Sequence, residues 1–365
     1  MLHPIDDHQL DRALRVRDLT DPAGGEHCLQ SLVEAAVAAL AGTWAADVHL
    51  RRAGRVVSVA DNYDALRYPP DGVAREARHT RYVSQATMLR SQMSALVPGA
   101  LRELADRRPA DALVACPGVV YRRDVIDRLH VGEPHQLDLW RVTSAPMTEG
   151  ELERMVALVC RALVPGRTVR TRPTEHSYTL AGREIEVAVD GDWVEIGECG
   201  LAHPELLAAS GLRGHHGLAM GIGLDRAAML RKGIDDIRVL RADDPRVVAQ
   251  MRDLAPYEAP SSQPPARRDL SLAARPGLDD VEVGEGVRDA LGEAAAWVEE
   301  AGIVSRTPGA ELSPVARARI GMRRDQENLL VRVILRHPAR SLPRAEANVL
   351  RDRIYAAVHE GLRPT

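Results

Sequence analysis

The spacing of hydrophobic residues along the chain predicts both helices and strands. In five segments apolar residues recur at every third or fourth position, as they do on the buried face of a helix. These expected helices are residues 26–40, 88–107, 147–163, 281–298 and 343–358. In other segments apolar residues alternate with polar ones or form short runs, which is typical of strands. These are residues 48–60, 112–120, 137–142, 185–196, 269–274 and 329–336.

The order of these elements favours one fold class. Strands and helices mix without the regular strand–helix–strand repeat of a doubly wound parallel sheet. We therefore predict an α+β fold in which helices flank an antiparallel sheet. Residues 256–265 read Pro-Tyr-Glu-Ala-Pro-Ser-Ser-Gln-Pro-Pro, which is the composition of a linker. The expected organisation is a first domain over 1–255, a Pro-rich linker over 256–266, and a second domain over 267–365 whose elements fit a small split βαβ unit.

Composition and charge narrow the functional classes. The chain has 365 residues and a formal net charge of −4, so any contact with tRNA or DNA would depend on local arginine clusters and not on a global basic field. Its four cysteines are scattered without a CxxC pair, which argues against a zinc ribbon or a disulfide framework. No apolar run approaches the roughly 18 residues of a membrane span, and the first residues lack the pattern of a secretory leader. We expect a cytoplasmic protein without a membrane partner.

A glycine-rich turn is the first candidate for chemistry. Residues 217–226 read Gly-Leu-Ala-Met-Gly-Ile-Gly-Leu-Asp-Arg and open a helical run. Such a turn lets backbone N–H groups approach a phosphate, and the arginine can grip its oxygens in a fork. An ordinary tightly packed strand-to-helix turn has the same pattern, so the motif alone leaves both interpretations open.

Four segments, in this order, resemble the catalytic core of phenylalanyl-tRNA synthetase, in its single-chain, organelle-type form. The resemblance covers about residues 15–255. The segments are Leu89-Arg90-Ser91-Gln92-Met93-Ser94-Ala95, Val120 to Asp138, Trp193-Val194-Glu195-Ile196-Gly197-Glu198-Cys199-Gly200, and the glycine-rich turn followed by Gly233-Ile234-Asp235-Asp236-Ile237-Arg238.

The second domain resembles the ferredoxin-fold anticodon-binding domain that this family carries at its C-terminus. The likeness rests on Arg268-Asp269-Leu270-Ser271-Leu272 and on residues 335–342. The alternative is an α/β sandwich of another kind. The resemblance implies tRNA as a partner.

The resemblance also implies an ATP site. Activating a carboxylate with ATP requires cations on the phosphates and an acidic residue for Mg²⁺, because charge neutralisation dominates phosphoryl chemistry. Arg122 is expected at the α-phosphate, Arg226 at the γ-phosphate, and Glu195 at the nucleotide and Mg²⁺. The other expected ATP-binding residues are Leu129, His130 and Val131, in a loop over ATP, and the turn residues Gly221 and Gly223. His130 and His135 could suggest a metal pair, but no third ligand has suitable spacing, and we expect His135 to be structural.

On the amino-acid side the chain departs from the family. Gln136, Asp138 and Ser94 stand where the family holds the α-ammonium group, and Gln92 replaces a histidine. The remaining amino-acid-binding residues implied by the resemblance concern the side chain. His176 and Tyr178 replace two phenylalanines that clasp the substrate ring, Met220 replaces another beside the pocket residue Ala219, and Glu198 replaces a glycine. The chain contains no phenylalanine at all.

The expected enzyme is an aminoacyl-tRNA ligase of the phenylalanine type. It would use ATP and Mg²⁺ to convert an amino acid, phenylalanine first among the candidates, to an aminoacyl-adenylate and pass the acyl group to tRNA, with tRNA-Phe expected. One alternative is a synthetase-like ligase or paralogue that activates a different or modified aromatic amino acid for secondary metabolism or resistance. Another is a catalytically silent regulator that binds tRNA or an amino acid. The sequence leaves open the exact amino acid and tRNA, and whether the chain is a monomer or a homodimer.

Overall fold

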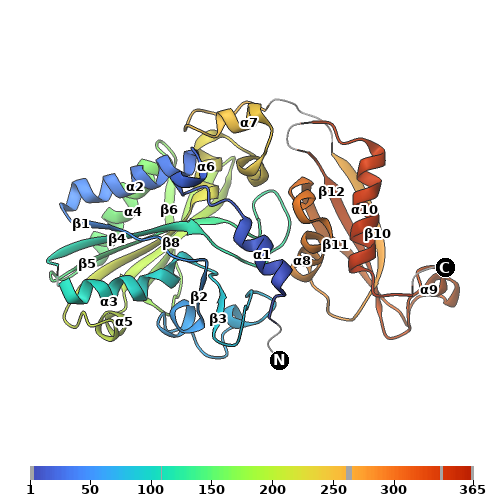
Figure 1. Ribbon diagram of the computed structural model, residues 1–365, viewed down its shortest axis with the longest axis horizontal. Coiled ribbons are helices and arrows are strands. Elements are labelled where there is room, and N and C mark those ends of the chain that lie inside the picture. The colour runs from blue at the N-terminus through green and yellow to red at the C-terminus, as the bar shows by residue number, and fades with distance from the viewer. Residues whose placement is uncertain (1–3, 108, 260–264, 338–339, 363–365) are drawn as a thin grey trace. The chain divides into compact units, whose positions relative to one another are not determined.

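In the computed structural model the chain folds into two units, each built around its own sheet (Figure 1). The structure describes residues 4–107, 109–259, 265–337 and 340–362. The first unit comprises Met1–Arg122, Glu133–Ile234 and Met251–Pro256, and the second comprises Arg123–Gly132, Asp235–Gln250 and Tyr257–Thr365. Two short segments that precede the expected linker therefore fold with the second unit. Residues 260–264 of the expected linker lie outside the described residues.

The first unit contains a seven-stranded sheet with the order β1-β4-β5-β9-β8-β7-β6. Only β1 and β4 pair in parallel, and the other neighbours are antiparallel. The predicted antiparallel sheet is thus confirmed. The strands are β1 (Asp47–Leu50), β4 (Asp111–Val119), β5 (His135–Thr143), β6 (Val169–Pro173), β7 (Thr179–Val189), β8 (Asp192–Ala202) and β9 (His216–Gly223).

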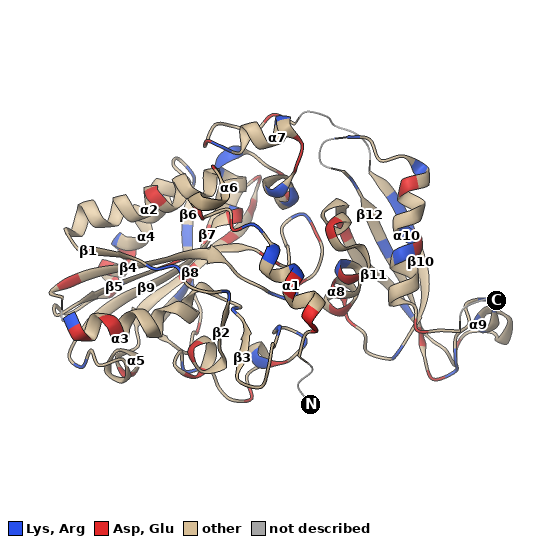
Figure 2. Cartoon of the chain, viewed as in Figure 1, with Lys and Arg blue, Asp and Glu red and all other residues tan. Residues whose placement is uncertain are grey.

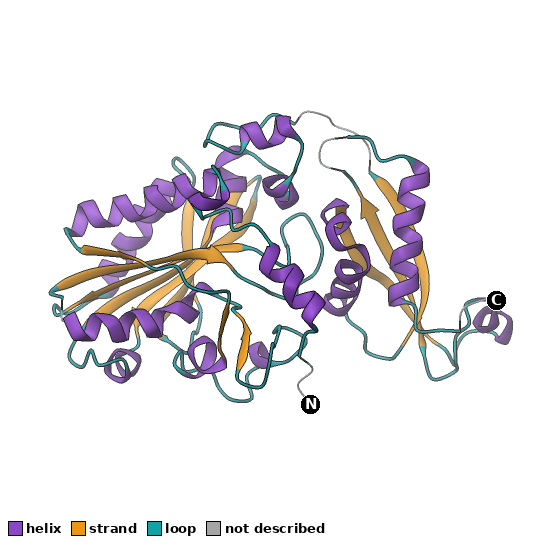
Figure 3. Cartoon of the chain, in the orientation of Figure 1, coloured by secondary structure: helices purple, strands orange, loops and turns teal. Residues whose placement is uncertain are grey.

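Helices cover both faces of this sheet (Figure 3). On one face lie α2 (Cys28–Trp44), α4 (Glu149–Leu163) and α6 (Leu224–Lys232), and on the other lie α3 (Val97–Arg107) and α5 (Pro204–Ala209). The core on the α3 side includes Leu101, Val114, Trp140 and Ala219, which pack as one cluster. The N-terminal helix α1 (Asp7–Arg15) begins with a capping box formed by Asp6 and Gln9.

The helix expected over residues 88–107 begins later than the pattern predicts. Residues Thr87–Leu89 form strand β3, which pairs with β2 (Val56–Ser58). A 3₁₀ turn, η4 (Met93–Leu96), follows, and the α-helix starts at Val97. Pro98 stands in its first turn, where proline favours a helix start. The consequence is that Gln92 and Ser94 lie at a turn and not on a helix face.

Strands β7 and β8 are joined by a two-residue turn. Asp190 and Gly191 both have positive φ, at 49° and 95°. Asp-Gly is the favoured pair for this kind of hairpin turn, because both residues tolerate the left-handed backbone that matches the twist of the strands. This hairpin carries Glu195 and Glu198 on β8.

The second unit has a three-stranded antiparallel sheet with the order β10-β12-β11. Its strands are β10 (Ala266–Ala274), β11 (Val298–Pro308) and β12 (Glu327–Leu335), and the helices α8 (Asp280–Leu291) and α10 (Arg344–Val358) pack together against it. The helix expected over residues 281–298 stops at Leu291, because Gly292 takes a positive φ of 58°. Of the expected segment 335–342, residues 338 and 339 lie outside the described residues.

Acidic and basic residues mix along the elements of each unit (Figure 2). This mixture agrees with the near balance of 48 Lys and Arg against 52 Asp and Glu. Within the described ranges, no helix is both long enough and apolar enough to cross a membrane.

Candidate active site

Three neighbouring strands place Asp138, Gly221 and Glu198 directly side by side, and we call these three residues the carboxylate row. Asp138 on β5 pairs with Gly221 on β9, and Gly221 pairs in turn with Glu198 on β8. Residues directly opposite each other in an antiparallel sheet project from the same face. A Cβ atom on Gly221 would lie 3.7 Å from Asp138 Oδ2 and 3.9 Å from Glu198 Cγ. Gly221 therefore leaves the strip between the two carboxylates without a side chain.

Asp138 is buried, and each of its carboxylate oxygens accepts a hydrogen bond. The Ser94 hydroxyl donates to Oδ2, and the Trp140 indole N–H donates to Oδ1 at 2.5 Å. The pKa of Asp138 is raised to about 7. Burial is the largest cause and the charge of Glu198 adds to it, whereas the two hydrogen bonds lower the pKa. Trp140 was not among the expected site residues, although it stands two residues after Asp138 on a strand and so had to share its face.

The two predicted glutamines support this end of the row. Gln136 Oε1 accepts the backbone N–H of Met93 at 3.1 Å. Gln92 donates to the carbonyl of Asn62 at 3.0 Å and accepts the Tyr68 hydroxyl at 3.1 Å. Asn62 and Tyr68 come from a distant segment around the π-helical turn η2 (Ala60–Asp64), and no local pattern pointed to them.

The other end of the row carries an ion pair surrounded by aromatic rings. Glu198 lies 2.5 Å from His176 Nε2, and it accepts the Tyr178 hydroxyl at 2.8 Å. The Tyr178 ring stacks with the rings of Trp140 and His176, at centroid distances of 6.1 and 5.9 Å. The structure therefore brings the two residues that replace phenylalanines into contact with the one that replaces glycine.

Electrostatics favour the charged forms of this pair. Burial alone would lower the pKa of His176, but the hydrogen bond and charge of Glu198 raise it. Burial alone would raise the pKa of Glu198, but His176 and the Tyr178 hydrogen bond lower it. Each partner thus offsets the desolvation of the other.

Ala219 and Met220 differ in their placement. Ala219 packs in the same cluster as Trp140 and Tyr178. Met220 directly precedes Gly221 on β9, and it pairs with Leu139 and Cys199, the residues that directly follow Asp138 and Glu198. Alternation along a strand puts its side chain on the opposite face, so the structure does not bring Met220 to the site.

The two predicted arginines are oriented by backbone carbonyls. Arg122 Nε donates to the carbonyl of Ser91 at 3.0 Å. Arg226, in the first turn of α6 after Gly223, donates to the carbonyl of Glu195 at 3.0 Å and lies 3.9 Å from its carboxylate. Burial raises the pKa of Glu195, while the charges of Arg226 and Arg122 lower it. The charge of Arg122 also lowers the pKa of Glu198, while Arg226 lies beside Glu195, three positions before Glu198 on the same strand.

The expected ATP-loop residues belong to another part of the structure. Leu129, His130 and Val131 fall in the segment Arg123–Gly132, which folds with the second unit. His130 Nδ1 is paired with Asp127 at 2.8 Å. Their contact with ATP stays a prediction.

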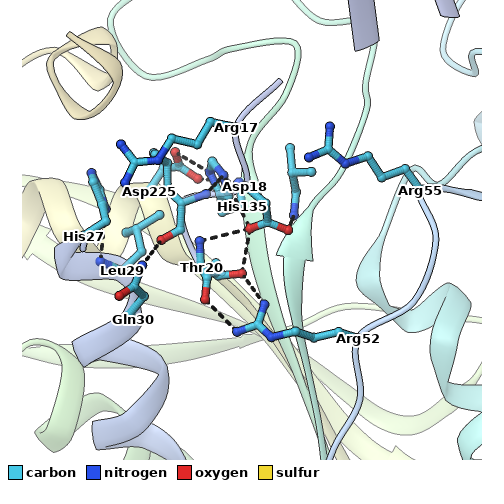
Figure 4. A network of polar contacts seen from close by, with 12 residues as sticks. Arg17, Asp18, Thr20, His27, Leu29, Gln30, Arg52, Arg55, His135 and Asp225 are labelled. Atoms are coloured by element: carbon cyan, nitrogen blue, oxygen red, sulfur yellow. Dashed lines mark hydrogen bonds and ion pairs between the residues drawn. The ribbon is translucent and has the colours of Figure 1, made fainter. Parts of the chain in front are cut away.

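A buried polar network holds the starts of β5 and α6 together (Figure 4). Asp225 accepts the backbone N–H of His135 at 2.5 Å and lies 3.3 Å from its Nδ1. The other ring nitrogen of His135 accepts the backbone N–H of Leu19 at 3.0 Å. The structural role expected for His135 is therefore confirmed. His135 directly precedes Gln136, which is expected at the amino acid, and Asp225 directly precedes Arg226, which is expected at ATP. The network therefore helps to fix the positions of both residues.

Asp18 extends this network to the end of β4. Its carboxylate accepts the Val119 N–H at 3.1 Å and the Thr20 hydroxyl at 2.7 Å, and Arg52 donates to the same threonine (Figure 4). Burial alone would raise the pKa of Asp18, but the Thr20 hydrogen bond and the charge of His135 lower it. The carboxylate is therefore kept in the form that accepts hydrogen bonds.

A largely antiparallel sheet with one parallel edge strand, covered by helices and bearing two arginines beside a row of carboxylates, defines the catalytic core of a class II aminoacyl-tRNA synthetase. The chain belongs to the family described as tRNA synthetases class II core domain (F), whose model matches residues 19–251.

Curated phenylalanine–tRNA ligase alpha subunits are similar in sequence to about half of this chain. The phenylalanine–tRNA ligase alpha subunit of Prochlorococcus marinus (strain NATL2A) is 32% identical over 191 residues, which is 52% of this chain and 56% of that subunit. The alpha subunit of Gemmatimonas aurantiaca is 37% identical over 198 residues, covering 52% and 57%. The chain thus spans about half the length of the curated relatives it matches.

Among solved structures, the pyrrolysyl tRNA synthetase PylSc of Desulfitobacterium hafniense is similar with a TM-score of 0.46 and 17% identity. The match covers 64% of this chain and 77% of that one.

Proposed function

We propose that this chain activates an amino acid with ATP as an aminoacyl-adenylate and then transfers the acyl group to tRNA. The observation that carries the proposal is that one strand, β8, brings together residues expected at the nucleotide and residues expected at the amino acid. Strand β8 carries both Glu195, whose backbone carbonyl accepts a hydrogen bond from Arg226 at 3.0 Å, and Glu198, which stands in the carboxylate row with Asp138. An amino acid held at Asp138 and a triphosphate held at Arg122 and Arg226 would therefore meet on one sheet face.

The first step joins the amino acid to AMP. Asp138, Ser94 and Gln136 hold the α-ammonium group, which leaves the substrate carboxylate free to attack the α-phosphorus. A bond forms from a carboxylate oxygen to that phosphorus, the bond to the bridging oxygen of the β-phosphate breaks, and pyrophosphate leaves with the electron pair. Arg122 neutralises charge on the α-phosphate, and Arg226 holds the γ-phosphate.

The donor set around Glu195 fits Mg²⁺. This ion usually takes one or two carboxylates and completes its shell with water and substrate phosphates. The Glu195 side chain is half exposed, and Arg226 lies 3.9 Å from it. When bound, the metal would supply further charge neutralisation at the phosphates. Within the described residues, no group of three His, Cys, Asp or Glu side chains could form a metal site made of protein ligands alone.

The second step passes the acyl group to a terminal hydroxyl of tRNA, which attacks the carbonyl carbon while AMP leaves. The names of the relatives support phenylalanine and its tRNA as the first candidates. The second unit, in which α8 and α10 pack against a three-stranded sheet, is our candidate for binding a part of the tRNA other than its acceptor end.

ATP–pyrophosphate exchange tests the proposal. We expect Arg226→Ala and Arg122→Ala each to lower the exchange rate at least 100-fold, because removing a positioned charge from the transition state typically costs about that factor. Arg154→Ala, at an exposed position on α4, is the matched control and should keep the exchange rate within about twofold. A wild-type chain that binds amino acid or tRNA but never exchanges pyrophosphate would support the silent regulator instead.

A further inference from the structure

We propose that the amino acid activated by this chain has a planar side chain with a hydrogen-bond donor at its far end, and that Glu198 is the residue that selects it. This inference rests on the proposed function, because it names the substrate class of the same site.

The sheet sets the distance between the two ends of the substrate. Asp138, Gly221 and Glu198 are direct neighbours across three strands, so the outer two backbones lie about 10 Å apart at a strand spacing of about 4.8 Å. An α-ammonium group at Asp138 leaves the substrate side chain free to run across Gly221. A side chain of the length of a substituted phenyl ring reaches Glu198 over this strip.

Glu198 has acceptor capacity left for a substrate. An ionised carboxylate offers about four lone-pair positions. His176 and Tyr178 are its hydrogen-bonding partners within the described residues, and 37% of its side chain remains exposed. A hydroxyl, amino or amide N–H group on the substrate would use the remaining positions, and would form a charge-assisted hydrogen bond.

An unsubstituted phenyl ring would fit this place less well. It would displace water from the exposed part of Glu198 and offer no hydrogen bond in return, which leaves a charged group poorly solvated. Sites with such polar groups reject substrates that lack the partner by large factors. Trp140 contacts Asp138, and Tyr178 and His176 contact Glu198, so aromatic rings stand at both ends of the strip and a planar side chain could gain aromatic contacts there.

The competing interpretation is that Glu198 and His176 form a cross-strand ion pair that supports the fold alone. Such a role would change the folding and total activity of a variant, but it would leave the ratio of its activities on two amino acids unchanged. Selectivity is therefore the readout.

The experiment measures ATP–pyrophosphate exchange by the purified chain with all standard amino acids, 3-hydroxyphenylalanine and 4-aminophenylalanine. We expect kcat/KM for tyrosine or one of these donor-bearing analogues to exceed that for phenylalanine at least tenfold. Glu198→Gly should lower this ratio at least tenfold. If the glycine variant fails to fold, Glu198→Gln keeps the shape and should lower the ratio several-fold, because the hydrogen bond loses its charge.

A matched control comes from helix α4. Glu153 is exposed there, and Glu153→Gln removes the same charge away from the carboxylate row. The selectivity ratio of this variant should stay at the wild-type value. A wild-type preference for phenylalanine, or a Glu198→Gly variant with unchanged selectivity, would overturn the inference and leave the proposed function standing. Exchange with no amino acid at all would overturn the proposed function itself.

Discussion

At the scale of single residues, Asp138 shows how burial prepares a charged group for a substrate. It is 4% exposed, and its row neighbours on either side are Cys116 and Gly221, with Glu198 beyond. Besides burial, the charge of Glu198 raises the pKa of Asp138. The charge of Asp138 in turn adds to the effect of burial in raising the pKa values of Cys116 and Tyr178. A cation such as an α-ammonium group would reverse this balance and favour the carboxylate.

The raised pKa of Asp138 predicts a pH dependence of stability. Its pKa is about 7 in the folded chain, against an ordinary value of 3.8 that applies once the chain unfolds, so the folded chain binds more protons between these values. The free energy of unfolding should therefore fall as pH rises from about 4 to about 7, by up to about 1.4 kcal/mol per pH unit from this group. Urea unfolding of the wild type and of Asp138→Asn at several pH values measures it.

The asparagine variant should lose this part of the pH dependence, because it has no proton to release. Asp192→Asn, at an exposed strand end, is the control and should follow the wild type. Parallel pH profiles for the wild type and Asp138→Asn would contradict the account of this residue.

The residue types of the site could be predicted from the sequence, but their partners could not. Alternation along β5 was enough to place Gln136, Asp138 and Trp140 on one face. The contact of Glu198 with His176 depends on the register of β8 and on a segment 22 positions earlier in the numbering, and no local pattern encodes it. Tyr68 lay beyond prediction for the same reason, since it reaches Gln92 from an irregular segment.

At the scale of elements, the site depends on how strand β5 and helix α6 begin. The backbone N–H of His135 and its ring both face Asp225, which is 2% exposed. Arg226 follows directly on α6, and Gln136 follows directly on β5. Because this carboxylate is buried and hydrogen-bonded, a change there should move both functional residues.

We expect Asp225→Asn to destabilise the chain by about 2 kcal/mol, since an amide offers one acceptor oxygen where the carboxylate offered two to His135. It should also raise KM for ATP in the exchange assay, because Arg226 loses its fixed position. Chemical unfolding and exchange kinetics check the two effects. Asp6→Asn is the control at an exposed helix cap, where asparagine caps equally well, and should change neither value. A stable Asp225→Asn with normal KM would show that the network does not position the arginine.

Element boundaries followed the sequence where one local signal dominated. The capped start of α4, where Thr148 accepts the N–H of Glu151, is of this kind. The segment 185–196, by contrast, was expected to alternate throughout, and the Asp190-Gly191 turn divides it between β7 and β8. The segment 88–107 was predicted as one helix because its apolar spacing continues through it, yet tertiary pairing with β2 made its first residues a strand.

At the scale of the whole molecule, the division into two units does not follow the order of the chain. Ile126 packs in the core of the second unit, and Arg288 donates to the carbonyls of Asp124 and Val125 at 2.6 and 2.9 Å. The segment that directly follows Arg122 is therefore part of that unit. The pairing joins residues more than 160 positions apart, so neither composition nor periodicity could reveal it.

The only lysine of the chain ties the end of the first unit to α6. The Lys232 ammonium donates to the carbonyls of Asp253 and Ala255 at 2.9 and 2.6 Å, and its side chain is fully buried. Lys232→Met should lower the free energy of unfolding by about 2 kcal/mol, because two carbonyls lose a charged donor. Urea unfolding measures this, and Arg231→Met on the same helix should stay within about 0.5 kcal/mol of the wild type. Equal stability of the two variants would contradict this role for Lys232.

The central claim is that the chain activates an amino acid with ATP, and ATP–pyrophosphate exchange by the purified protein tests it most directly. The assay is run with each standard amino acid and the aromatic analogues in turn, with and without total tRNA. We predict exchange that depends on one amino acid or a small group of aromatic ones and that Arg226→Ala lowers at least 100-fold. Exchange with none of them, or exchange unaffected by Arg226→Ala, would contradict the claim.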